Sequence, residues 1–212
     1  MNLADQRKEY QRQTLDESHI SANPVEQFAN WLADAQQNPQ ILEANVMHLA
    51  TVSADHKPTI RVVLLKGLED GTFVFFTNYE SRKGQELAQN DAACLNFYWD
   101  ALERQVRIEG KVEKISAAQS EHYYNSRPLA SRIGAIVSPQ SKPVAKDFLE
   151  KQFEQLSQVY TENNLPKKPE NWGGYRLLPD YFEFWQGRPS RLHDRIVYEK
   201  NDQNWTIKRI AP

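Results

Sequence analysis

The sequence predicts an α+β fold built on an antiparallel barrel, and the order of its segments leads to this prediction. Short β-rich runs separated by turn residues fill residues 46–115, two helical segments follow between residues 116 and 163, and β-rich runs return from residue 175. The chain has 212 residues, enough for one domain to bury a full core without a disulfide or a metal. One domain with helices flanking a barrel is therefore expected.

In the β-rich runs, apolar and polar residues tend to alternate, as they do along a strand with one buried face. In RQVRIEGKVEKI, Val106, Ile108 and Val112 fall on one face and mostly polar residues on the other. The first five runs are expected to form a meander of about five strands. These runs are VMHLATV, IRVVLLK, TFVFFTN, AACLNFYW and RQVRIEGKVEKI, and further strands are expected in YRLLP, YFEFWQG, RLHDRIVYE and WTIKRIAP.

Apolar residues at helical spacing predict the helices. PVEQFANWLADAQQ is expected to begin a helix at Pro24, and SRKGQELAQN to form a short one. SAAQSEHYYNSRP should stop near Arg127, because Pro128 disfavours helix before it. The apolar stripe of PVAKDFLEKQFEQLSQVYTEN is expected to face the core. It consists of Ala145, Phe148, Leu149, Phe153, Leu156 and Tyr160.

Composition excludes several classes of function. A formal net charge of −2 argues against a general nucleic-acid binder. No stretch approaches the roughly 20 apolar residues that cross a bilayer, and the first residues lack the apolar core of a secretory signal, so a cytoplasmic protein is expected. The single cysteine, Cys94, lies in an apolar run and reads as a small buried hydrophobe. Without a glycine-rich phosphate loop, a His/Cys cluster at metal spacing or a serine elbow, neither a metal nor a hydrolase is expected.

Basic residues gather near the C-terminus, in RLHDR. If this segment is a strand, Arg191, His193 and Arg195 share one face, while Leu192 and Asp194 point to the other. Such a face repels itself unless an anion lies on it.

A second basic group lies at the start of the short helix in SRKGQEL. With Asn78 or Ser81 as the N-cap, Arg82 and Lys83 fall in the first turn, where a bound phosphate would accept from both side chains and from free backbone N–H groups. A solvated basic turn is an equally good interpretation of this motif alone.

A third group joins a helix end to the residues beyond it. Tyr123 and Arg127 are four apart on one helix face, and Ser131 follows the proline. The group suits a phosphate site, but taken alone it favours a surface pair at a helix stop. Arg61 and Lys66 bracket an apolar run, which alone reads as the ends of a buried strand. Together, these segments have too few nearby acids, and they favour a ligand or ligands with two phosphates and a flat aromatic body.

At this point a family resemblance becomes evident. RVVLLK, FFTNYESRK, ERQVRIEGKVE, YYNSRP, SPQS, WGGYR, FWQG and RLHDR, in this order and spacing, resemble pyridoxamine 5′-phosphate oxidases from about Pro24 to the C-terminus. The resemblance implies a homodimer of split, Greek-key-like β-barrels that bind flavin mononucleotide (FMN) between subunits. It also implies oxidation of pyridoxine 5′-phosphate or pyridoxamine 5′-phosphate to pyridoxal 5′-phosphate, with dioxygen reduced to hydrogen peroxide and ammonia released from the amine.

The resemblance also assigns site residues by position. The expected FMN contacts are Arg61, Val62, Val63, Leu64, Leu65, Lys66, Phe76, Thr77, Arg82, Lys83, Gln105, Gln140, Ser141, Trp185 and Arg195. The expected substrate contacts are Lys66, Tyr123, Arg127, Ser131, Arg191, Leu192 and His193, together with Arg7 and Tyr10. Arg191 and His193 are the expected catalytic residues.

The sequence also predicts how the chain is divided and leaves two other functions open. Residues 1–23 are expected to be a mobile segment that closes over the site, and residues 24–212 to be the single domain. One rival is a related split-barrel flavin reductase, which would lack the combination of YYNSRP and RLHDR. The other is a carrier that binds FMN or pyridoxal phosphate without turnover, which peroxide release would exclude.

Overall fold

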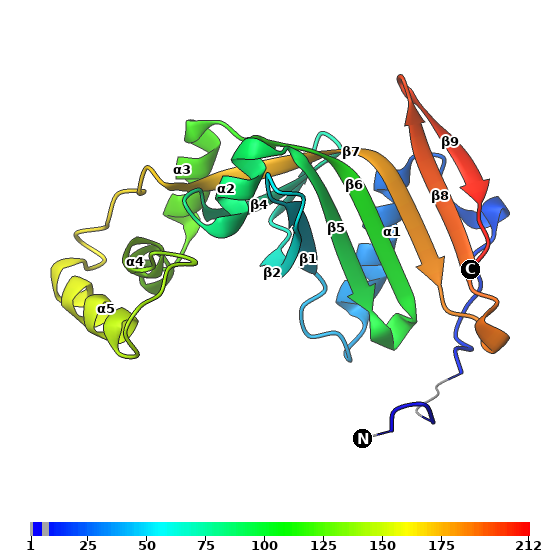
Figure 1. Cartoon of the computed structure of the whole chain (residues 1–212), viewed down its shortest axis with the longest axis horizontal. Coiled ribbons are helices and arrows are strands. Elements are labelled where there is room, and N and C mark those ends of the chain that lie inside the picture. The colour runs from blue at the N-terminus through cyan, green and yellow to red at the C-terminus, as the bar shows by residue number, and fades with distance from the viewer. Residues whose placement is uncertain (1, 6–8) are drawn as a thin grey trace.

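The computed structural model describes residues 2–5 and 9–212 and contains a nine-stranded antiparallel sheet (Figure 1). The order is β2-β1-β5-β6-β7-β4-β3, and β8 and β9 continue from β7. The sheet curls so that β4 comes near β2. Just before β3, the Lys66 N–H donates to the Val74 carbonyl of β4 over 2.8 Å. The predicted α+β split barrel is confirmed.

The strands and helices have the following bounds. The strands are β1 Val46–Val52, β2 Pro58–Leu64, β3 Gly67–Glu69, β4 Thr72–Asn78, β5 Ala92–Trp99, β6 Arg104–Lys114, β7 Trp172–Gln186, β8 Asp194–Asn201 and β9 Asn204–Arg209. The helices are α1 Pro24–Gln37, α2 Arg82–Gln89, α3 Ala117–Ser126, α4 Leu129–Val137 and α5 Phe148–Val159, with 3-10 turns η1 Glu17–His19, η2 Asp100–Leu102 and η3 Pro189–Arg191.

The order of the strands differs from the predicted meander. β4 pairs with β7 instead of its sequence neighbour β5, so the β3–β4 hairpin lies at the opposite end of the sheet from β2. The two runs YRLLP and YFEFWQG form one strand, β7, because a register shift beside Gly110 accommodates Pro179. A Cβ at Gly110 would lie 2.1 Å from the Leu178 carbonyl oxygen, so only glycine fits there.

The core lies between the sheet and α1. Alternate residues of β5, β6 and β7 point inward and pack against Phe28, which contacts Phe73 at 5.0 Å and Phe97 at 4.9 Å between ring centroids. The helix starts as predicted, with Pro24 in its first turn and the Asn23 side chain accepting from the Val25 N–H. Within the described residues, no helix is long and apolar enough to span a membrane.

The arm formed by α4 and α5 was predicted least well. No helix was predicted over α4, and α5 begins at Phe148, after Ala145 of the predicted apolar stripe. None of the α5 residues is buried, and the helix packs on α4, away from the sheet (Figure 1). The prediction that its apolar stripe faces the core of this chain is therefore wrong, because a helical period shows that a face is apolar but not what covers it.

Cys94 lies half-buried on β5. Burial raises the pKa of its thiol to about 11, so the thiol stays protonated at neutral pH.

Candidate functional site

A pocket of about 650 Å³ lies where β2, β4, α2 and the α3–α4 segment meet. It contains three cations, Lys66, Lys83 and Arg127, and no carboxylate among the described residues that line it. We call it the cationic pocket. Its lining is Val62, Val63, Leu64, Lys66, Phe76, Thr77, Asn78, Lys83, Tyr123, Arg127, Pro128, Ser131, Gly134, Ala135, Ser138, Gln140 and Trp172.

Lys83 is the most enclosed cation of this pocket, with 8% of its surface exposed. Ser81 caps α2, as predicted, and places Lys83 in the first turn. The Nζ donates to Thr77 Oγ1 over 3.0 Å and to Gln140 Oε1 over 2.9 Å. Burial, reinforced by the positive charge of Arg61, lowers the pKa of Lys83 to about 8. A ligand anion in the pocket would favour the charged form.

Arg127 ends α3 and lies beside a stack of aromatic rings. Its guanidinium lies 4.8 Å from the centre of the Trp172 ring, and burial lowers its pKa. Its Nη1 is buried and has no hydrogen-bond partner in the described part of the chain. The rings of Phe76 and Tyr123 stack at 3.8 Å with an interplanar angle of 19°. A buried donor without a partner is costly, so it marks a place where an anionic ligand would be stabilised.

The predicted phosphate ligands Arg61 and Arg82 have a different environment. Both contact Glu86, which is 4% exposed and pairs with Arg61 Nη2 at 3.2 Å and Arg82 Nε at 2.9 Å. Burial would raise the pKa of Glu86, but hydrogen bonds from Thr51, Thr59 and Arg82 and the charge of Arg61 lower it to about 2. The expectation of too few acids near these cations is wrong here, because Glu86 comes from the same helix as Arg82, one turn later.

A second group of predicted site residues lies at the other end of β7. The ring of Trp185 contacts His193 at 4.8 Å, and Tyr10 packs against Trp185 at 5.6 Å and His193 at 5.7 Å. We call these three residues the aromatic cluster. The Arg188 backbone N–H donates to His193 Nδ1 over 3.1 Å, so a neutral His193 carries its proton on Nε2. Burial, followed by the charge of Arg191, lowers the pKa of His193 and favours this neutral form.

The prediction that Arg191, His193 and Arg195 share a strand face is wrong. β8 begins only at Asp194, and Arg191 lies in η3 with a φ of 61°. Pro189 opens this turn, and Ser190 also has a positive φ, so the backbone before β8 is curled rather than extended. Arg195 alone lies in the strand, where it donates twice to Glu183 Oε1 at 2.8 Å.

The face of the sheet opposite the core contains the remaining predicted contacts. Gln105, Trp185 and Arg195 pair in register across β6, β7 and β8 and therefore share this face. On β2 the same face has Ile60 and Val62, which are 65% and 59% exposed. It is therefore an outer face with exposed apolar residues at the β2 edge.

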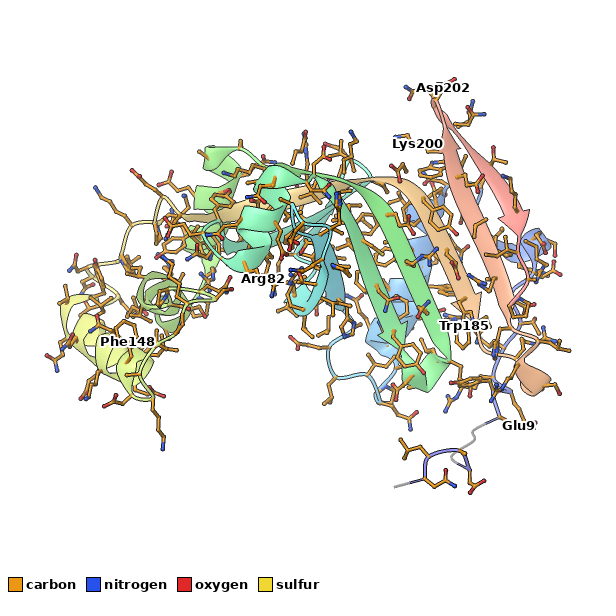
Figure 2. All side chains as sticks on the ribbon, in the orientation of Figure 1. Glu9, Arg82, Phe148, Trp185, Lys200 and Asp202 are labelled. Carbon is orange, nitrogen blue, oxygen red and sulfur yellow. The ribbon has the colours of Figure 1, made fainter. Side chains whose placement is uncertain are left out.

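The structure thus divides the predicted site residues into two groups. Arg82 and Trp185 are well separated in Figure 2, with β5 and β6 between them in this view. Leu65 is buried in the core, Ser141 and Leu192 are exposed, and Arg7 lies outside the described residues. The cationic pocket brings together Val62, Val63, Leu64, Lys66, Phe76, Thr77, Lys83, Tyr123, Arg127, Ser131 and Gln140. The other end of β7 has Tyr10, Gln105, Trp185, Arg191, His193 and Arg195.

Sequence reasoning missed two residues that shape the site. Trp172 forms a wall of the cationic pocket, and the WGGYR motif that contains it was the only signal available. Glu86 could have been found from its position four residues after Arg82 on one helix face.

Comparisons with known proteins identify the family of the chain. Residues 33–160 match the family model described as "Pyridoxamine 5'-phosphate oxidase", and residues 172–212 match the "Pyridoxine 5'-phosphate oxidase C-terminal dimerisation region". The chain belongs to the pyridoxamine 5′-phosphate oxidase family. It is 52% identical over 213 residues to the pyridoxine/pyridoxamine 5'-phosphate oxidase of Bordetella pertussis, covering 100% of both chains. It is 54% identical to the protein of the same name from Cytophaga hutchinsonii, covering 100% of this chain and 99% of that one.

Two solved structures share the fold of the chain. PhzG from Burkholderia lata, in complex with tetrahydrophenazine-1-carboxylic acid, superposes with a TM-score of 0.87 at 26% identity, covering 94% of this chain and 98% of that one. A pyridoxamine 5'-phosphate oxidase-related, FMN-binding protein from Nostoc punctiforme superposes with a TM-score of 0.73 at 23% identity. The match covers 91% of this chain and 100% of that one.

Proposed function

We propose that this protein uses FMN and dioxygen to oxidise pyridoxine 5′-phosphate or pyridoxamine 5′-phosphate to pyridoxal 5′-phosphate. Hydrogen peroxide is the second product, and the amine substrate also releases ammonia. The observation that carries the proposal is the cationic pocket, where three cations lie without a carboxylate among its described lining residues. Such a pocket suits phosphorylated ligands, and its aromatic rings suit a flat one.

The residues of the pocket fit an FMN phosphate on one side and a substrate phosphate on the other. Lys83, with Thr77 and Gln140 around its Nζ, would hold the FMN phosphate. Arg127 has a buried Nη1 without a described partner and lies next to Tyr123, which makes it the best candidate for the substrate phosphate. Lys66 and Ser131, which line the same pocket, would complete this second group.

The aromatic cluster and the residues around it would act on the reacting end of the substrate. The chemistry that FMN supplies when bound is acceptance of a hydride from the substrate carbon and transfer of the electrons to dioxygen. Arg191 would hold and polarise the substrate. His193 would orient it by donating from Nε2, since its Nδ1 already accepts from the Arg188 N–H.

A homodimer would unite the two groups of residues. One chain separates the cationic pocket from the aromatic cluster, and the segment that matches the dimerisation region includes Trp185, His193 and Arg195. The exposed apolar residues Ile60 and Val62 on the outer face suit burial against a second copy. We infer that the pocket of one protomer meets the outer face of its partner, with FMN between them.

Anaerobic reduction of the bound flavin tests the function. The purified protein should be yellow, and pyridoxine 5′-phosphate added without air should bleach it, with peroxide released once air is admitted. A flavin that stays oxidised with this substrate but is bleached by NADPH would instead support the flavin reductase. Binding of pyridoxal phosphate without any bleaching would support the carrier.

Mixed dimers test whether the site is shared. Arg127→Ala and Arg191→Ala each remove one half of the proposed site, so each variant alone should have little activity. Co-expression should restore about a quarter of the wild-type activity, because half of the random two-fold dimers carry one intact site of two. Absence of any recovery, with mixed dimers verified by tagging, would mean that each site belongs to one chain.

A further inference from the structure

Glu103 binds the N-terminal segment from the turn between β5 and β6. It is 2% exposed and adopts a left-handed backbone with a φ of 56°. Its Oε2 accepts from the backbone N–H groups of Gln11 and Arg12, over 2.9 and 3.1 Å. Its own carbonyl accepts from the Gly187 N–H over 2.8 Å, directly after β7. One buried residue thus connects the N-terminal segment with the end of β7.

Asp194 binds the same segment a few residues further along. Its Oδ2 accepts from the Leu15 N–H over 3.0 Å and from Arg188 Nη1 over 2.9 Å. Its Oδ1 accepts from Arg209 Nη1 over 2.8 Å, and Arg209 also donates to the Leu15 carbonyl. We call residues 10–15 the strap, since carboxylates hold both its ends.

Tyr10 is the strap residue that contacts the aromatic cluster. Its ring packs edge-on against both Trp185 and His193. A Cβ at Gly187 would lie 2.7 Å from Tyr10 Cγ, so the ring fills the space that glycine leaves. The position of Tyr10 over His193 therefore depends on where the strap is held.

We propose that Glu103 and Asp194 are positioning residues, which hold the strap so that Tyr10 covers His193 and Trp185 during turnover. The role rests on the proposed function, because it acts through the predicted catalytic residue His193. Glu103 accepts two main-chain N–H groups of the strap and Asp194 accepts one, so these hydrogen bonds do not depend on the strap's side chains. Charge-assisted hydrogen bonds of this kind are about twice as strong as neutral ones.

Substitution of Glu103 gives the sharpest test. Glu103→Ala removes the acceptor, whereas Glu103→Gln retains an oxygen that can take both N–H groups. Glu103→Ala should lower kcat/KM for pyridoxine 5′-phosphate about tenfold at unchanged FMN affinity, and Glu103→Gln should recover most of it. Glu113→Ala, which removes an exposed carboxylate paired with Arg176, is the matched control and should leave kcat/KM unchanged.

A double-mutant cycle separates positioning from general stabilisation. In a Tyr10→Ala background, Glu103→Ala should cause no further loss of kcat/KM, because the group that Glu103 positions is already absent. Gly187→Ala would place a Cβ 2.7 Å from Tyr10 Cγ, so it should displace Tyr10 and reproduce the loss of kcat/KM. Full additivity of Glu103→Ala and Tyr10→Ala, or wild-type kcat/KM in Gly187→Ala, would overturn the proposal.

Amide hydrogen exchange tests the strap independently of activity. Glu103→Ala should speed exchange at Gln11 and Arg12, whereas Asp194→Ala should speed it at Leu15. Unchanged exchange at these amides would overturn the proposal even in an active enzyme. If the wild-type protein proved inactive with both phosphorylated substrates, the proposed function would fail, while exchange would still report whether the carboxylates hold the strap.

Discussion

Arg82 and Lys83 are adjacent in the sequence, yet their surroundings are opposite. Arg82 points along the helix to Glu86 and is 60% exposed, while Lys83 turns about a quarter of the way round the helix and is buried against Thr77 and Gln140. Lys83 belongs to a pocket with no carboxylate among its described lining residues. Of these two neighbouring cations, Arg82 is neutralised by a carboxylate of its own helix, whereas the charge of Lys83 is directed into the cationic pocket.

The same contrast separates three other predicted cations, Arg61, Arg195 and Arg127. Arg61 and Arg195 contact the buried carboxylates of Glu86 and Glu183. Arg127 has instead an aromatic face and an unpartnered buried Nη1 within the described residues. Arg61 and Arg195 are thus neutralised by carboxylates of the chain itself, whereas the surroundings of Arg127 support its proposed role in binding a phosphate.

Loss of Arg127 should have the largest effect. Arg127→Ala should lower kcat/KM for pyridoxine 5′-phosphate by about 100- to 1000-fold, because a buried charge partner of the phosphate is removed. FMN affinity should change little, and Lys57→Ala, which removes an exposed cation paired with Asp55, should leave turnover unchanged. Steady-state kinetics with FMN in excess give the comparison. A decrease of kcat/KM by less than threefold in Arg127→Ala would mean that Arg127 does not bind the substrate phosphate.

Loss of Lys83 should mainly weaken flavin binding. Lys83→Met should raise the Kd for FMN by about 10- to 100-fold, as expected for a hydrogen bond to a charged group. Because the pKa of Lys83 is about 8, its charge is present below that pH and lost above it. FMN affinity, followed by quenching of flavin fluorescence, should therefore fall above pH 8 in the wild type and stay flat there in the variant. The same alkaline decline in Lys83→Met would contradict this assignment.

Loss of Glu86 should act on stability. The pKa of Glu86, about 2, lies below its ordinary value of 4.5. The stability that ionised Glu86 adds to the fold is therefore complete above pH 4.5 and is lost as the pH falls towards 2. The shift corresponds to stabilisation on the order of 3 kcal/mol at neutral pH. Glu86→Gln should lower the free energy of unfolding, measured in urea at neutral pH, by about this amount. Between pH 4.5 and 2, the free energy of unfolding should then fall less steeply in the variant than in the wild type. An unchanged acid limb would show that other carboxylates dominate it.

Loss of Arg82 should have the smallest effect. Arg82 is 60% exposed, and Glu86 keeps its contacts with Arg61, Thr51 and Thr59 when Arg82 is removed. Arg82→Ala should therefore lower the free energy of unfolding by only about 0.5 kcal/mol. The Kd for FMN should rise by less than threefold, measured beside Lys83→Met. An equal rise of the Kd for FMN in Arg82→Ala and Lys83→Met would show that Arg82 contributes to FMN binding despite its ion pair with Glu86.

Local sequence patterns predicted many of the helix and strand boundaries, and the family resemblance supplied most of the predicted residues of the cationic pocket. Pro24 and Ser81 set helix starts, Pro128 ended α3, and alternation in β6 identified its inward face, because each depends on neighbours within a few residues. The spacing of Tyr123, Arg127 and Ser131 likewise brought these side chains to one pocket.

Only the tertiary structure decided which charges are paired, which strands are neighbours and what α5 covers. The pairing of Arg61 with Glu86 joins β2 to α2, and the pairing of β4 with β7 spans about half the chain, so neither leaves a local trace. Arg191 and His193 were misplaced because a turn with two left-handed residues precedes β8. Long-range contacts of this kind depend on the whole packing of the chain, and short-range periodicity contains no information about them.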